Sequence, residues 1–199
     1  MHISEGVLSP PVLITGTLLT AGGLVVAVKS IKPNEIPKVA LLTSAFFIAS
    51  LVHVPIGLSN AHLVLNGLLG ILLGKGAFAA IFIALVLQAV LFQFGGLTTL
   101  GVNTFNIAVP GIIFGVIAQH LISVEKKKLS FIVSWLTGFL SILGSGFLVA
   151  LSLWMSGENL LLAAQLIFSA HIPVAIVEGF VTATAVSFLL KVKPEIFRR

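Results

Sequence analysis

Long apolar runs fill most of this chain, and short polar or glycine-rich stretches separate them. A helix crosses a bilayer with about 20 apolar residues, and the runs predict about seven such crossings. The predicted spans are Pro11–Val28, Val39–His53, His62–Leu73, Ala77–Phe92, Ile107–Leu121, Phe131–Trp154 and His171–Leu190. The third and fourth spans flank a Gly-Lys-Gly sequence that suits a tight helical hairpin. Leu160–Phe168 is too short to cross, so we expect a partial or interfacial helix there.

Composition supports the same architecture. The chain is 58% hydrophobic and 9% charged, whereas soluble domains carry about 25% charged residues. We therefore expect an all-α, polytopic membrane protein, with residues 1–199 forming a single membrane domain. The chain has no cysteine, which excludes disulfides, thiolate zinc sites and iron–sulfur ligation. The N-terminus lacks the basic region of a secretory signal.

The basic residues predict the orientation. With the N-terminus outside, the four inner segments are residues 29–38, 74–76, 120–130 and 191–199, and they contain all 11 lysines and arginines. Cytoplasmic loops carry the Lys/Arg excess of membrane proteins. We expect a multi-pass protein of the cell (inner) membrane, embedded in the lipid bilayer, with the N-terminus outside and the C-terminus cytoplasmic. This arrangement explains the net charge of +5 without a nucleic-acid partner.

Most of the histidines lie on the outer side in this topology, opposite to the basic residues. Four of the five, His2, His53, His62 and His171, fall at outer ends of spans. The same side carries Glu5 and Glu158 and has no lysine or arginine in this topology. A cation that arrives from outside would meet metal ligands and no fixed positive charge.

The first two residues offer a chelate. The α-amine of Met1, the backbone nitrogen of His2 and the Nδ1 atom of its ring can bind one cation through two fused rings, roughly in a plane. A fourth planar position remains for one imidazole from elsewhere. Planar nitrogen coordination favours Ni(II) or Cu(II), and imidazole nitrogen also suits cobalt and zinc. A frayed terminus is the alternative, but the apolar residues that follow favour a tail tucked into the bundle.

Two other outer stretches carry polar groups that suit such a site. Residues 55–67 hold His62 near the predicted start of the third span, and residues 93–106 combine glycines with threonine and asparagine. Irregular backbone at membrane depth persists only where protein or a water-filled cavity covers it. We expect the second stretch to form a wall of the site and to hydrogen-bond to the ligand imidazoles. The candidates for this supporting role are Glu5, Asn60, Asn66, Thr98, Thr99 and Asn103.

Glu178 is the one acid inside a predicted apolar span, which is costly without a partner. We expect a structural hydrogen bond to a neighbouring span, for example to Gln88. No catalytic sequence is evident: His-Glu-x-x-His, a P-loop and Gly-x-Ser-x-Gly are all missing. The sequence therefore predicts neither an enzyme nor an ATPase, and uphill transport would need energy from another protein.

These residues resemble the CbiM/NikM family, the substrate-binding (S) components of energy-coupling-factor (ECF) transporters for cobalt and nickel. The resemblance covers nearly the whole chain. It rests on Met1-His2-Ile3 with Glu5-Gly6, on His62, on Gly95–Asn106, and on Pro173–Thr182. It implies that the amine of Met1, the nitrogen and ring of His2, and the ring of His62 bind the metal.

The resemblance also implies partners: an EcfT-type membrane coupling protein like CbiQ, ATPase subunits like CbiO and a small accessory membrane protein. We expect no cofactor, only Co(II) or Ni(II) as substrate, and the choice between the two metals stays open. Two alternatives remain. One is an S component for a vitamin-like organic solute, which would need a larger pocket lined with aromatic side chains. The other is an intramembrane zinc enzyme built on His2, His62 and His171.

Overall fold

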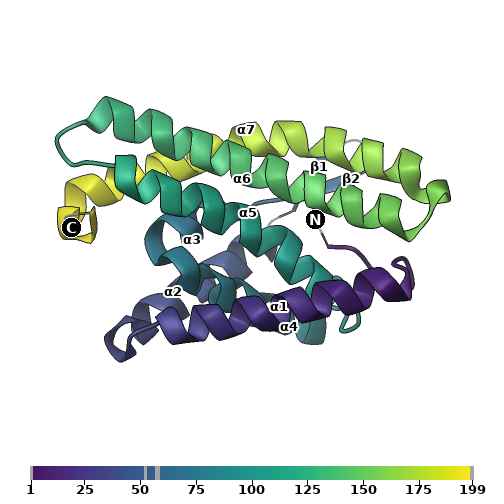
Figure 1. Ribbon diagram of the computed structural model, residues 1–199. Helices are drawn as coiled ribbons and strands as arrows, with labels where there is room; N and C mark the ends of the chain where they lie inside the picture. The colour runs from purple at the N-terminus through teal and green to yellow at the C-terminus, as the bar shows by residue number, and fades with distance from the viewer. Residues whose placement is uncertain (1, 52, 57–58, 198–199) are drawn as a thin grey trace.

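The computed structural model describes residues 2–51, 53–56 and 59–197. Helices dominate, as the sequence predicts, and Figure 1 shows them packed as one bundle. The α-helices are α1 (Pro10–Ser30), α2 (Ile36–Leu51), α3 (Asn66–Leu73), α4 (Ala77–Phe92), α5 (Leu100–Leu121), α6 (Lys127–Ser156) and α7 (Leu161–Val192). Short 3₁₀ turns lie at Pro33–Glu35, Gly74–Gly76, Glu158–Leu160 and Pro194–Phe197. Two antiparallel strands, β1 (His53–Ile56) and β2 (Ser59–His62), connect α2 to α3.

Within these described residues, five runs are long and apolar enough to cross a membrane. They are Pro10–Ser30, Asn66–Phe92, Leu100–Leu121, Lys127–Ser156 and Glu158–Val192. The second run joins α3 and α4 through a break at Gly74, where φ is 55°. The predicted seven helical segments correspond to α1–α7, but α2 has only 16 residues and α3 only 8.

The short helix α3 is the buried centre of the bundle. Its residues Asn66 to Leu72 are all buried, and the helix lies against α5 and α6. A Cβ atom on Gly70 would lie 1.9 Å from the carbonyl oxygen of Gly111, and one on Gly111 would lie 2.6 Å from the carbonyl oxygen of Asn66. Small residues thus let the backbones of α3 and α5 touch, as membrane helices commonly do.

The positively charged segments lie together at one end of the bundle, which we call the basic end. The α1–α2 turn, the α5–α6 turn and the C-terminal end of α7 lie there, on the left of Figure 1. The Gly74–Gly76 turn joins them, because Lys38 Nζ donates to the carbonyl of Leu72 at 2.6 Å and Gly76 lies against Ile31. Of the residues predicted to be basic and inner, Arg198 and Arg199 lie outside the described residues.

Several predicted boundaries are wrong. The second and third spans were expected to reach His53 and His62, but both histidines lie on the β1–β2 hairpin, where they are opposite each other in register. Helix α5 begins at Leu100 rather than Ile107, so the stretch 100–106 is helical. The short segment predicted at Leu160–Phe168 starts at the end of the 3₁₀ turn Glu158–Leu160 and is otherwise the first part of α7, which continues through Pro173 without a break. A proline inside a membrane helix is tolerated when neighbouring groups satisfy the freed carbonyl.

Candidate metal site

The N-terminal tail, residues His2 to Ser9, folds into the bundle instead of leaving it. Ile3 and Leu8 are buried, with exposed fractions of 5% and 7%. They pack in a small apolar cluster with Val102 of α5 and with residues of α6 and α7. At the end of the tail, the Ser9 amide donates to Ser156 Oγ at 3.1 Å. Apolar burial at positions 3 and 8 therefore docks the tail, as its apolar residues predict.

Asn103 holds the tail by its main chain. Its Oδ1 atom accepts from the Ile3 amide at 2.9 Å, and its Nδ2 atom donates to the Ile3 carbonyl at 3.0 Å. Thr99 Oγ1 donates to the same carbonyl at 2.9 Å and accepts from Asn103 Nδ2 at 3.2 Å. We call this set of bonds the Asn103 clamp. It fixes the residue that directly follows His2.

Two glycines let the 93–99 loop close over the tail. A Cβ on Gly96 would lie 1.9 Å from Glu5 Cγ, and the Glu5 carboxylate accepts from the Thr98 amide at 3.1 Å. Gly95 has φ of 78°, a conformation that suits glycine, and a Cβ there would be 3.4 Å from His2 Cβ. The loop thus covers the tail next to His2. Thr99 of the loop and Asn103 of α5 bond to the tail backbone, whereas we expected bonds to the ligand imidazoles.

The tail brings His2 next to His62. The two imidazole rings are stacked, with centroids 5.3 Å apart and an interplanar angle of 25°. Phe94 of the loop lies beside the His2 ring, with centroids 6.3 Å apart and an interplanar angle of 33°. Residues 60 positions apart in the chain thus place two imidazoles in contact.

The backbone around His62 selects one of its ring tautomers. His62 is buried, 7% exposed, and its Nδ1 atom lies 3.1 Å from the Leu63 carbonyl oxygen. Since a carbonyl only accepts, this contact places the ring proton on Nδ1 and the lone pair on Nε2. The hydrogen bond of one ring nitrogen sets which nitrogen of a histidine can bind metal, so Nε2 is the coordinating atom that this geometry offers.

The other predicted site residues lie in different parts of the fold. Met1 lies outside the described residues. Asn60 lies on β2, opposite Pro55 in register, and only its main chain is described. Asn66 is buried at the start of α3, where its Nδ2 atom donates to the Ile107 carbonyl at 2.8 Å and to Ser145 Oγ at 3.0 Å. These bonds connect α3 to α5 and α6.

Two further buried groups, Glu178 and His171, do not make the contacts that the sequence suggested. Glu178 does not bond to Gln88: its carboxylate accepts from the amides of Val64 and Leu65, while Gln88 Nε2 donates to Ser50 Oγ. His171 bonds to its own helix, with Nδ1 2.6 Å from the Ile167 carbonyl. Among the described residues, no group of three or more His, Cys, Asp or Glu side chains could hold a metal ion. The proposed three-histidine zinc cluster is therefore not formed by those residues.

Comparison with known proteins assigns this fold. A family model described as the cobalt uptake substrate-specific transmembrane region, CbiM, matches residues 2–196. The chain belongs to the CbiM family. As a member of this family it is a multi-pass membrane component of cobalt or nickel uptake, and a transporter subunit rather than an enzyme.

Relatives of this CbiM-family chain support the assignment. A Haemophilus influenzae protein whose name describes metal transport is 35% identical over 201 residues, which cover 100% of this chain and 98% of that protein. A crystal structure of a truncated transition metal transporter superimposes with a TM-score of 0.81 at 29% identity, covering 96% of this chain and 99% of that one.

Two relatives are longer fused chains. A nickel transport protein of Archaeoglobus fulgidus named NikMN is 27% identical and covers 100% of this chain, which spans 68% of its length. A cobalt transport protein of Methanocorpusculum labreanum named CbiMQ is 30% identical and covers 99% of this chain, which spans 36% of its length. These fusions indicate that CbiM-family proteins act beside further transporter subunits.

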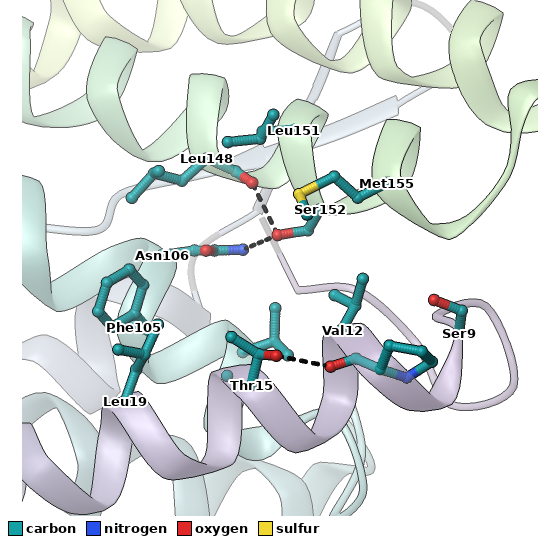
Figure 2. A pocket seen from close by; sticks show the side chains of 13 residues that line it. Ser9, Val12, Thr15, Leu19, Phe105, Asn106, Leu148, Leu151, Ser152 and Met155 are labelled. Carbon is teal, nitrogen blue, oxygen red and sulfur yellow. Dashed lines mark hydrogen bonds between the residues drawn. The ribbon is translucent and has the colours of Figure 1, made fainter.

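A cavity of about 270 Å³ lies beside the tail, between α1, α5 and α6 (Figure 2). Its lining is largely apolar and includes a single aromatic side chain, Phe105. The Asn106 and Ser152 side chains in its wall bond to each other at 3.1 Å. Polar atoms that already pair with each other leave few ligands for a divalent cation in this cavity.

The Asn103 clamp can be tested without metal. Asn103 is 2% exposed, and the substitution Asn103→Leu keeps its γ-branched shape while leaving the buried Ile3 amide without its acceptor. Such a loss costs about 1–3 kcal/mol, which lowers the ratio of docked to undocked tail by about 5- to 150-fold. Hydrogen exchange of the N-terminal peptide should accelerate accordingly. Asn106→Leu, one turn further along α5, is the matched control; equal acceleration in both variants would contradict the clamp.

Proposed function

We propose that this protein is the substrate-capture (S) subunit of an ECF-type transporter, which takes up Co(II) or Ni(II) from outside the cell. The observation that carries the proposal is the stacking of His2 on His62, held by a tail that the Asn103 clamp fixes at Ile3. Family membership supplies the class of substrate. The tail supplies nitrogen atoms that can bind the metal.

The ligands in this proposal are four nitrogens. The amine of Met1, the backbone nitrogen of His2 and the Nδ1 atom of His2 form a fused chelate, and Nε2 of His62 completes the plane. Binding must displace protons from the amine and from the His2 amide, so affinity should fall steeply in acid. Planar coordination favours Ni(II), while the family description names cobalt. The substrate is therefore Co(II) or Ni(II), with no cofactor.

The ring separation supports two imidazoles on one ion. A metal–imidazole nitrogen distance is about 2 Å, so rings in neighbouring coordination positions have centroids roughly 4–5 Å apart. The separation of 5.3 Å between His2 and His62 is only slightly wider. A small shift of either ring would bring both onto the same cation.

Charge supports an outward-facing site. Every lysine in the described part of the chain lies at the basic end (Figure 1), and the positive-inside rule places that end in the cytoplasm. The N-terminus is then outside, and the helices make about seven crossings of the cell (inner) membrane. A cation approaching the tail meets Glu5 and no nearby lysine, which favours its entry.

We infer that the protein works with other subunits. The fused relative CbiMQ supports an EcfT-type coupling partner of the CbiQ kind, and NikMN supports a small accessory membrane protein. ATPase subunits of the CbiO kind would supply the energy, because the chain has no P-loop. An S component for an organic solute is less well supported, since the apolar cavity beside the tail holds one aromatic ring.

Substitution of the loop ligand tests the site. His62→Ala should leave the tail chelate in place and replace one imidazole by water, weakening Ni(II) binding by about 100-fold. Calorimetry measures the affinity, and the visible band of planar Ni(II) should move to longer wavelength because water is a weaker ligand. His171→Ala, which removes a histidine bonded to its own helix, is the control. Unchanged affinity and spectrum in His62→Ala would refute the four-nitrogen site.

A further inference from the structure

Glu178 is a buried acid whose carboxylate reaches from α7 to the start of α3. It is fully buried, 0% exposed. Its Oε1 and Oε2 atoms accept from the Leu65 amide at 3.0 and 3.2 Å, and Oε1 also accepts from the Val64 amide. A buried backbone amide that loses its acceptor is costly, so these hydrogen bonds are important to the local structure. The carboxylate therefore ties two consecutive amides of the segment that follows β2.

That segment carries His62. Val64 is two residues after the histidine, and the Leu63 carbonyl between them is the group that contacts His62 Nδ1. Leu65 has φ of 56° and ψ of 15°, a left-handed conformation that is unfavourable for a residue with a Cβ atom. The hydrogen bonds that the Val64 and Leu65 amides donate to Glu178 hold the backbone in this conformation and so fix the direction in which the chain leaves His62.

The position of Glu178 is itself rigid. A Cβ on Gly138 of α6 would lie 2.6 Å from the Glu178 carbonyl oxygen, and one on Gly67 of α3 would lie 3.0 Å from the Thr137 carbonyl oxygen. Contacts this close favour glycine at positions 67 and 138, where a side chain would meet a backbone carbonyl. The helices α3, α6 and α7 thus meet backbone to backbone around the carboxylate, and its location is set by the bundle.

We propose that Glu178 is a positioning residue for metal capture, which acts on His62 through the main chain of Val64 and Leu65. The proposal rests on the proposed function, in which His62 is the fourth ligand. Glu178 does not touch the ion; it keeps the His62 ring against the ring of His2. Loss of a group that orients a metal ligand typically weakens binding by about 10- to 100-fold.

A double-mutant cycle tests this role. Ni(II) affinity is measured by calorimetry for the full chain, for Glu178→Ala, for His62→Ala and for the double variant. We expect Glu178→Ala alone to weaken binding by about 10- to 100-fold and to shift the planar Ni(II) band as His62→Ala does. In the His62→Ala background, Glu178→Ala should change affinity less than about threefold, because residues that act as one unit are not additive.

The control is Gln119 of α5, which contacts the other end of α3. Gln119 Nε2 donates to the carbonyls of Gly70 and Ile71 at 3.2 and 2.7 Å, so Gln119→Ala also removes two backbone contacts from α3. It should lower thermal stability without moving the Ni(II) band. If Glu178→Ala does not fold, the cycle is run with Glu178→Gln, which keeps one acceptor oxygen and should give a smaller change in the same direction.

The outcomes are distinguishable. If Glu178→Ala weakened Ni(II) affinity in the His62→Ala background as much as it does alone, the positioning role would be overturned. The proposal that His62 is a ligand would be unaffected. A shift of the band by Gln119→Ala equal to that by Glu178→Ala would also overturn the positioning role, since general loosening of α3 would then suffice. If His62→Ala itself had no effect, the proposed function would fail and this inference with it.

Discussion

A short N-terminal extension is expected to abolish high-affinity metal binding. Adding Ser-Gly-Ser ahead of Met1 converts its amine into an amide and removes the first ring of the chelate. We expect Ni(II) affinity to fall by more than about 1,000-fold, equivalent to about 4 kcal/mol, and proton release on binding to fall with it. Calorimetry in buffers of different ionisation enthalpy measures both quantities.

The length of the extension matters. A single added residue would put the histidine third from the new amine, so that the amine, two amides and the ring could form a four-nitrogen set without His62. Three added residues avoid this. The docked tail should persist, because the Asn103 clamp holds Ile3, and hydrogen exchange of the tail verifies it. The same three residues added after the C-terminus are the control. A docked, extended tail that binds Ni(II) as tightly as before would exclude the amine as a ligand.

Removing the His2 ring is expected to have an equally large effect in cells. His2→Ala deletes one ligand and the stacking partner of His62, so uptake of Co(II) or Ni(II) should fall to the level of cells that lack the protein. Radiometal accumulation, normalised to the amount of protein in the membrane, is the measurement. The predicted loss corresponds to an affinity change of more than about 1,000-fold.

The choice of control makes this second test specific. His120→Ala removes an exposed histidine at the basic end of α5 and should leave uptake unchanged. An S component for an organic solute would tolerate His2→Ala, because its substrate would not depend on a chelating tail. Normal metal uptake by His2→Ala cells would therefore count against the metal site and in favour of that alternative.

Hydrophobic runs predicted the helices well where polar residues or glycines interrupt them. The predicted span Ala77–Phe92 coincides with α4, whose ends are set by Gly76 and by Gln93 in a left-handed conformation. The tail was also predictable, since Ile3 and Leu8 have apolar side chains that water disfavours. The gathering of lysines at one end followed from their spacing between runs.

Other features depend on contacts that no local pattern reveals. The β1–β2 hairpin interrupts apolar sequence that resembles a helix end, and α5 begins early because Asn103 and Thr99 find partners in the distant tail. Polar side chains lower the hydropathy of residues 100–106, yet these side chains are buried by tertiary contact. The partner of Glu178 was missed because the amides of Val64 and Leu65 become available only when α3 starts at Asn66.

The Asn103 clamp has one more consequence. Its hydrogen bonds involve only the amide and carbonyl of Ile3, while the Ile3 side chain is buried in the apolar cluster with residues of α5, α6 and α7. Main chain and side chain together therefore fix the position of Ile3. A residue inserted between His2 and Ile3 would move the His2 ring away from His62 while Ile3 stayed in place.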